Sequence, residues 1–235
     1  MKLKNFTNYK KNPLPEPTDG DPWKRELVAS LQENLDKLNY AVNGLGKDVG
    51  VSGWKDNLAA LAGQPTGANA PTLANFGPTG NIKQPAFATV AGGDSVYVIW
   101  HIDHDIKPGS TGYMHVHWTT DGTSTDEVRW EITYTQALGH NQYAADGTTP
   151  ISLFSEDTTV VVQEAASGHA WQHMVTEDQT GFLVPEPDSL IVAEVKRVAT
   201  TPNNTDTVFG LFVDIHYESD RELTPQRAPD FYLEN

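Results

Sequence analysis

Cysteine is absent from the 235-residue sequence, which excludes disulfide bonds, zinc–thiolate sites and cysteine nucleophiles. A chain without cysteine suits folding in a reducing cytoplasm. Basic residues are few: 16 lysines and arginines stand against 31 acidic residues, for a net charge of -15. A surface this acidic repels phosphate backbones and anionic lipids, so we expect neither nucleic acid nor a membrane as a partner.

Long apolar runs and familiar catalytic motifs are also missing. No apolar run approaches the roughly 20 residues that a membrane-spanning helix needs, and Asn5, Thr7 and Asn8 stand where a secretion signal would need its apolar stretch. The sequence contains no Gly-x-Ser-x-Gly, no glycine-rich phosphate loop and no His-Glu-x-x-His. We therefore predict no secretion signal, no anchor, no cofactor, no catalytic residue and no enzymatic activity.

Residues 1–20 form a basic and proline-rich N-terminal segment. Pro13, Pro15 and Pro17 alternate with other residues, which forbids a helix and favours an extended chain. A basic tail on an acidic body is typical of a segment that docks onto another molecule. The residues expected to dock are Lys2, Lys4, Lys10 and Lys11.

Residues 21–62 are predicted to be a helical oligomerisation segment. Asp21 and Pro22 make a good helix start, and Gly44 supplies a stop. The apolar residues recur three or four positions apart, close to a coiled-coil repeat. Two interpretations stay open, namely an amphipathic helix packed on its own domain and a short inter-chain bundle. The residues of the expected oligomer seam are Leu27, Leu31, Leu35, Leu38 and Val42.

A second short helix is expected over residues 53–61, and the Gly-, Pro- and Ala-rich residues 63–80 are expected to be a linker or arm.

Residues 81–235 then form the predicted β domain with a C-terminal surface tail. Its strands alternate apolar and polar residues or are rich in β-branched and aromatic residues, and turn sequences separate them. The fold class is therefore mainly β, an antiparallel sandwich, with a jelly roll as the expected topology. The predicted strands are 94–102, 113–120, 126–136, 158–165, 170–177, 189–199 and 206–219.

Histidines give the strongest hint of chemistry. His115 and His117 lie two residues apart on a predicted strand, which places them on one face about 7 Å apart, a spacing suited to metal ligands. His101 or His104 from a neighbouring strand could complete a three-histidine site. The alternative is that these residues are the polar positions of a half-buried strand, and on this basis we assign no metal. Tryptophans 100, 118, 130 and 171 could line a sugar site, but alternating tryptophans on strands more often form a core.

Several long strings carry a family resemblance: residues 100–118, 128–142, 186–197, 209–221 and 224–232. Together with the Gly-Trp-Lys-Asp segment at 53–56, they resemble a family of uncharacterised virion proteins of tailed bacteriophages, over about residues 53–232. The resemblance implies a structural component of the phage particle, as a capsid decoration protein or as a tail needle or fibre knob. It also implies synthesis in the bacterial host cytoplasm, a location in the virion, other virion proteins as partners, and a homo-oligomer that we expect to be a trimer.

Two alternatives from other functional classes stay open. One is a cupin-like metal-binding enzyme that uses His101, His104, His115 and His117. The other is a module that binds a glycan on a host surface. Metal content would test the first alternative, and binding to a glycan array would test the second.

Overall fold

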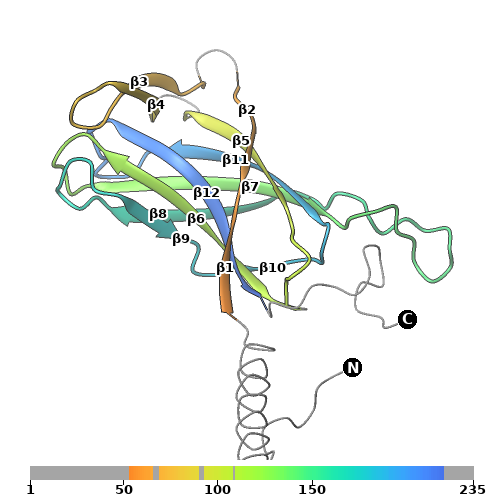
Figure 1. The fold of residues 1–235 in the computed structure, drawn as a ribbon. Helices are drawn as coiled ribbons and strands as arrows, with labels where there is room; N and C mark the ends of the chain where they lie inside the picture. The colour runs from red at the N-terminus through yellow and green to blue at the C-terminus, as the bar shows by residue number, and fades with distance from the viewer. Residues whose placement is uncertain (1–52, 66–68, 90–92, 108, 220–235) are drawn as a thin grey trace, which may run out of the picture.

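Two antiparallel β-sheets packed face to face make up the described part of the chain (Figure 1). The computed structural model describes residues 53–65, 69–89, 93–107 and 109–219. All regular elements of these residues are strands. The described residues contain no helix that is long and apolar enough to cross a membrane. The prediction of a mainly β, antiparallel sandwich is confirmed. The predicted helix over 21–44, its leucine seam and the N-terminal lysines lie outside the described residues.

The seven-stranded sheet is built around β12. Strand β12 pairs with β6 along one edge, and its other edge is divided between β4 and β1. Strand β3 continues the sheet beyond β4, and β9 and β10 both pair with β6. The strands are β1 (Gly53–Leu58), β3 (Thr72–Phe76), β4 (Ile82–Phe87), β6 (Thr111–Thr120), β9 (Met174–Glu177), β10 (Phe182–Leu183) and β12 (Val208–Ser219).

The five-stranded sheet forms the second layer, and all of its strand pairs are antiparallel. The strand order is β2-β5-β11-β7-β8, so β11 is inserted between two strands that precede it in the chain. The strands are β2 (Ala60–Gly63), β5 (Ser95–His101), β7 (Glu127–Ala137), β8 (Thr158–Ala165) and β11 (Leu190–Val198).

The core lies between the two sheets, where alternate residues of each strand point inward. Trp100 on β5, Trp118 on β6 and Trp130 on β7 are fully buried there. These three tryptophans are therefore core residues, as the sequence favoured, and cannot line a sugar site. Trp171 is half-buried and packs against Phe76 and Phe209.

The β domain begins earlier than the sequence predicted. The helix expected over 53–61 is wrong: β1 pairs residue by residue with β12, and β2 pairs with β5. The physical reason is a two-residue period, because Trp54, Asp56 and Leu58 are exposed while the residues between them are half-buried. The expected linker over 63–80 is also corrected, since it contains β3, which forms a hairpin with β4.

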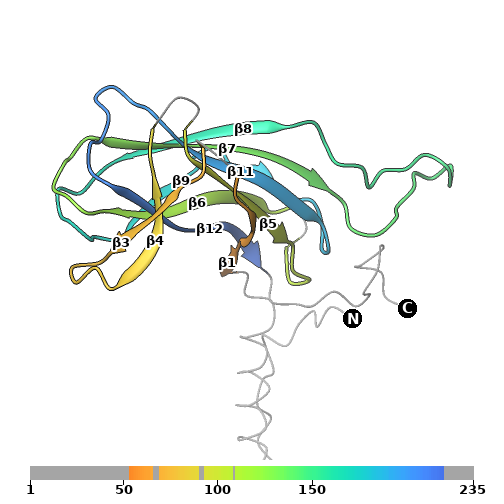
Figure 2. The same cartoon turned by 90° about the horizontal axis from the view of Figure 1, so that it is seen from above.

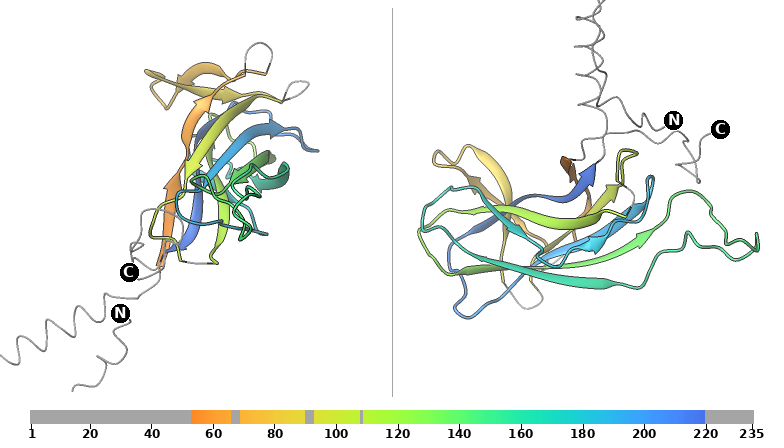
Figure 3. Two further views of the ribbon diagram at one scale, coloured as in Figure 1. Left: turned by 90° about the vertical axis from the view of Figure 1, so that its right-hand side faces the viewer. Right: turned by 90° about the horizontal axis from the view of Figure 1, so that it is seen from below.

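A long excursion connects β7 to β8 over residues 138–157. Figure 2 and the right-hand panel of Figure 3 show it extending well beyond the two sheets, in green to teal. An isolated bridge between Tyr143 and Pro150 holds it together, and backbone and side-chain bonds to Asp146 form its tip. Leu153 and Phe154 near its return are exposed.

Candidate functional site

The outer face of the seven-stranded sheet collects most of the chemistry-bearing side chains. On β6 and β12 the inward residues are apolar, so the alternate residues, including His115 and Asp214, fall on the outer face. Strand register then places His115 opposite Asp214, and His216 between Tyr113 and Asp56. We call this surface the histidine face. Its residues are Trp54, Asp56, Tyr113, His115, His117, His173, Glu177, Phe212, Asp214 and His216.

Asp214 is the buried centre of the histidine face, with only 2% of its surface exposed. Its Oδ1 lies 3.3 Å from Nδ1 of His115, and its Oδ2 lies 3.3 Å from Nε2 of His117. The prediction that His115 and His117 share a face is confirmed, and their ring centroids are 6.2 Å apart. One buried carboxylate therefore lies between two imidazoles.

The second nitrogen of each imidazole also has a partner. Nε2 of His115 lies 2.8 Å from Oε2 of Glu177, and because a carboxylate can only accept, the imidazole donates. Nδ1 of His117 lies 2.9 Å from Nε2 of His173. These contacts fix the orientation of both rings toward Asp214.

Charge interactions at the centre are strong. Burial alone would raise the pKa of the Asp214 carboxyl, but its interactions with His115 and His117 outweigh burial and lower this pKa to about 2. The pKa of His115 is raised, mainly by Asp214 and less by Glu177, and burial opposes this shift. The centre therefore favours a carboxylate next to positive charge.

Two polar atoms at this centre have no hydrogen bond from any described residue. Oδ1 of Asp214 and Nε2 of His117 are both buried, and their 3.3 Å contacts lack hydrogen-bond geometry. Buried polar atoms without partners are uncommon, because each one carries a desolvation cost of about 1 to 3 kcal/mol. Both atoms face the space between the imidazoles and the carboxylate.

Aromatic rings border this polar centre. Trp54 on β1 is 59% exposed, and its ring lies edge-on to His216 at 5.0 Å and tilted against Tyr113 at 5.9 Å between centroids. Phe212 is 41% exposed and stacks on His117 with centroids 4.0 Å apart. With Trp54 and Phe212 this exposed, none of the strands described here forms a third layer over these rings.

His101 and His104 belong to a different group. Nε2 of His101, Nε2 of His104 and Nε2 of His140 lie 3.2, 3.0 and 2.7 Å from the carboxylate of Asp188, respectively. These residues lie at the end of the five-stranded sheet and in nearby loops, whereas β6 belongs to the other sheet. The four-histidine cluster proposed from the sequence is therefore split into two separate groups.

Four members of the histidine face were not predicted from the sequence, namely Asp214, His216, His173 and Glu177. The residues Asp214 and His216 are two apart on β12, as are His115 and His117 on β6, so strand alternation could have flagged them. His173 and Glu177 come to the face through β9, whose pairing with β6 has no local sequence marker.

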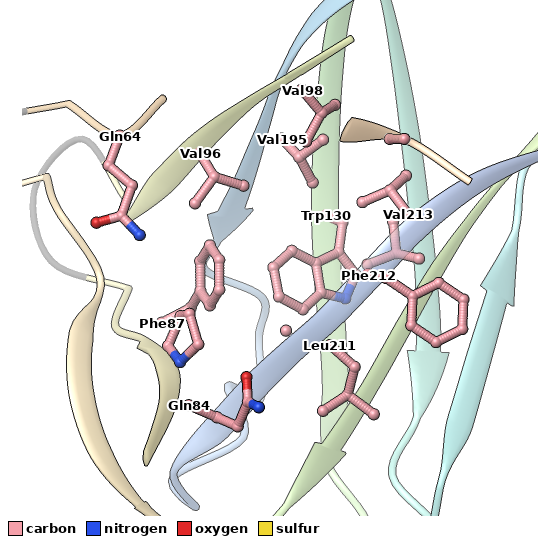
Figure 4. A pocket seen from close by; sticks show the side chains of 14 residues that line it. Gln64, Gln84, Phe87, Val96, Val98, Trp130, Val195, Leu211, Phe212 and Val213 are labelled. Atoms are coloured by element: carbon pink, nitrogen blue, oxygen red, sulfur yellow. The ribbon is translucent and has the colours of Figure 1, made fainter. Parts of the chain in front are cut away.

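A cavity of about 240 Å³ is a second candidate site (Figure 4). It lies at one end of the core, where β4 pairs only with the first two residues of β12. Its wall is almost entirely apolar, and Gln64 and Gln84 are its main polar side chains. The lining residues include Phe87, Val96, Val98, Trp130, Val195, Leu211, Phe212 and Val213.

Comparisons with known proteins give no family assignment. No protein-family model matches the chain, and no curated protein matches it. Among solved structures, similarity is found to CBM35 from Cellvibrio japonicus Abf62, with 12% identity and a TM-score of 0.30 over 70% of this chain and 92% of that one. It is also found to Xyl-CBM35 in complex with a glucuronic acid-containing disaccharide, with 14% identity and a TM-score of 0.29 over 70% and 90%.

This finding contradicts the main functional prediction from the sequence. Both neighbours are carbohydrate-binding modules, and neither is a bacteriophage protein. The prediction of a structural component of a phage particle is corrected on this finding, and glycan binding is considered below as a proposal. At TM-scores this low, neither neighbour indicates which residues of this chain would contact a ligand.

Proposed function

We propose that the chain is a non-catalytic module that binds a glycan on the histidine face. The observation that carries this proposal is Trp54, an exposed indole on a sheet surface that also presents imidazoles and carboxylates. A tryptophan that is mostly exposed in a 235-residue chain forfeits a large hydrophobic contribution to folding. Retaining it there favours a role in binding.

The geometry around Trp54 suits a sugar ring. The indole contacts His216 edge-on and Tyr113 at a tilt, and these contacts restrict its orientation before a ligand arrives. The apolar C–H face of a pyranose packs on such a ring, as other apolar groups do in small-molecule sites. His216 and Asp56, which lie 3.7 Å apart at the same place, offer donor and acceptor atoms to hydroxyl groups.

The negative charge of the chain limits the class of glycan that we expect it to bind. The chain carries a net charge of -15, and Asp56, Glu177 and Glu218 lie on the same face as Trp54. The net charge of the chain disfavours binding of an anionic polysaccharide. We therefore expect neutral or amino sugars as ligands.

Strand order supports a jelly-roll topology for this module. Strands β4 to β7 alternate between the two sheets, β8 pairs with β7, and β9 returns to β6. The last two strands are then inserted, β11 between β5 and β7 and β12 between β4 and β6. This alternation is the arrangement of two Greek keys that defines a jelly roll.

Glycan-array screening followed by calorimetry tests the proposal. Trp54→Ala should weaken binding of the best glycan about 10-fold or more, because the packing of the sugar ring on the indole is lost while strand β1 remains paired. Tyr97→Ala is the matched control, since Tyr97 is an exposed aromatic on the five-stranded sheet, and it should leave affinity unchanged. Absence of any glycan ligand at millimolar concentration, or equal affinity of Trp54→Ala and wild type, would overturn the proposal.

A further inference from the structure

We propose that His115, His117 and Asp214 form a binding site for one divalent transition-metal ion of the zinc class. The three residues offer ligand atoms that all lie within 4.8 Å of one another. They come from two adjacent strands of one sheet, so their spacing is set by the β6–β12 ladder and does not depend on a loop. This proposal goes beyond glycan binding and does not rest on it.

Two distances at the centre have the length expected between ligand atoms of one metal ion. With metal–nitrogen bonds of about 2.0 to 2.1 Å, two ligand atoms of a tetrahedral zinc ion lie about 3.3 Å apart. Nδ1 of His115 lies 3.3 Å from Oδ1 of Asp214, and Nε2 of His117 lies 3.3 Å from Oδ2, so each imidazole approaches a different oxygen of the carboxylate. Each separation is longer than a good hydrogen bond and close to the distance between two ligand atoms of one zinc ion.

Both imidazoles are held with the correct nitrogen facing inward. His115 donates from Nε2 to Glu177, which leaves Nδ1 toward Asp214. The contact between Nδ1 of His117 and His173 likewise leaves Nε2 of His117 toward Asp214. Metal-bound histidines usually donate their other N–H to a carboxylate or another acceptor, which orients the ring and raises its basicity.

A bound cation would give the unpaired polar atoms at this centre an interaction partner. Nε2 of His115 and Nδ1 of His117 are committed to Glu177 and His173, so the inner nitrogens and the Asp214 carboxylate face one another. Oδ1 of Asp214 and Nε2 of His117 have no hydrogen-bond partner among the described residues. Either a proton on an imidazole or a metal ion supplies the missing positive charge. A metal ion satisfies all three groups at once, whereas one proton satisfies a single pair.

The donor set selects the class of ion. Two neutral imidazoles and one carboxylate suit zinc and its late first-row neighbours, while calcium and magnesium prefer sites made of oxygen atoms. Three protein ligands leave a fourth position for water or for a donor atom of a ligand. The ring of Phe212 stacks on His117 beside the site, with ring centroids 4.0 Å apart.

A neighbouring group provides the sharpest control. Asp56, His115 and His216 also bring ligand atoms within 4.8 Å of one another, and they share His115 with the proposed site. Asp56 is exposed, whereas Asp214 is buried. Asp214→Asn and Asp56→Asn are therefore matched changes that remove one carboxylate from each group and leave His115 in place.

The experiment titrates zinc chloride into the full chain after treatment with a chelator, with calorimetry and, for cobalt(II), visible absorption as readouts. Wild type should bind one ion per chain. Asp214→Asn and His117→Gln should weaken binding at least 100-fold, whereas Asp56→Asn and His169→Gln, which changes an exposed histidine, should bind as wild type does.

Each other outcome of this titration overturns the proposal. Loss of binding in Asp56→Asn but not in Asp214→Asn would place the ion at the neighbouring group. Wild type that binds no ion below 100 µM would show that a proton, not a metal, occupies the centre. Thermal unfolding in the presence of chelator shows which variants are folded. If Asp214→Asn does not fold, the binding measured for His117→Gln decides the result. Glycan binding by the metal-free chain is measured separately, so the two proposals can fail independently.

Discussion

At the scale of single residues, Asp105 connects three segments that are distant in the sequence. Its carboxylate accepts hydrogen bonds from Lys55 on β1 at 3.1 Å, from the Tyr217 hydroxyl at 3.1 Å and from the Ser219 hydroxyl at 3.0 Å. Burial would raise the pKa of Asp105, but the bonds from Lys55, Ser219 and Tyr217 outweigh it, and the pKa lies below its ordinary value of 3.8.

The charge of Asp105 stabilises the fold through these bonds. Asp105→Asn should lower the free energy of unfolding at pH 7 by about 1.5 to 2 kcal/mol, the low end for bonds to a charged group, because water reaches Lys55. Since the folded pKa of Asp105 is depressed, its stabilisation is present above pH 3.8 and is lost as the pH falls through the folded pKa.

Urea unfolding at pH 7 and at pH 2 to 3 measures this effect. The gap between wild type and Asp105→Asn should narrow in acid, where the wild-type carboxyl takes up a proton. Asp157→Asn, at an exposed aspartate in the excursion between β7 and β8, is the control and should change little at either pH. A gap that is constant from pH 7 to pH 2 would show that the carboxylate charge contributes nothing.

At the scale of elements, the strands after residue 94 were predicted to within a few residues, except for the two-residue β10, and the strands before residue 90 were not predicted. Strand β8, for example, spans Thr158–Ala165, as predicted. Long strands are recognisable from the sequence because apolar and polar residues alternate along them, with one face buried over eight or more residues. The short strand β1 has no buried apolar face of its own and is stabilised by pairing with β12. Pairing partners of this kind are not visible in a local sequence window.

The same limit applies to the candidate site. The shared face of His115 and His117 follows from their spacing, which is a local property. That Asp214 lies between them depends on the register of β6 and β12, two strands that are far apart in the chain. Register is set by the whole sheet and by its turns, so a single sequence does not reveal it.

The excursion between β7 and β8 gives a prediction at this scale. Its bridge and turn bonds are internal, and Leu153 and Phe154 are exposed. Replacing both by Ser should change the free energy of unfolding by no more than about 1 kcal/mol, because little buried area is lost. Ile132→Ala, at a fully buried position on β7, is the contrast and should cost about 2 to 5 kcal/mol. A large loss in the double Ser variant would mean that these side chains are covered in solution.

At the scale of the whole molecule, the boundary of the folding unit moves from residue 81 to residue 53. A fragment of residues 53–219 should unfold cooperatively with a β-type circular dichroism spectrum. A fragment of residues 81–219 lacks β1, β2 and β3, and this exposes one edge of β12 and of β5. Unpaired edges promote aggregation, so this shorter fragment should be less stable and prone to associate in light-scattering measurements. Equal stability of the two fragments would restore the boundary at 81.

The pairing of β1 with β12 also has a mechanical consequence. Gly53 lies opposite Ser219, so the two ends of the described domain leave it side by side. Tension applied between these ends would load the ladder one residue pair at a time and unzip it from Gly53 toward Leu58. A load applied along the strands would instead have to break all the pairs together. The domain should therefore yield at low force when pulled by its ends, yet it can be inserted within another chain without separating the flanking segments.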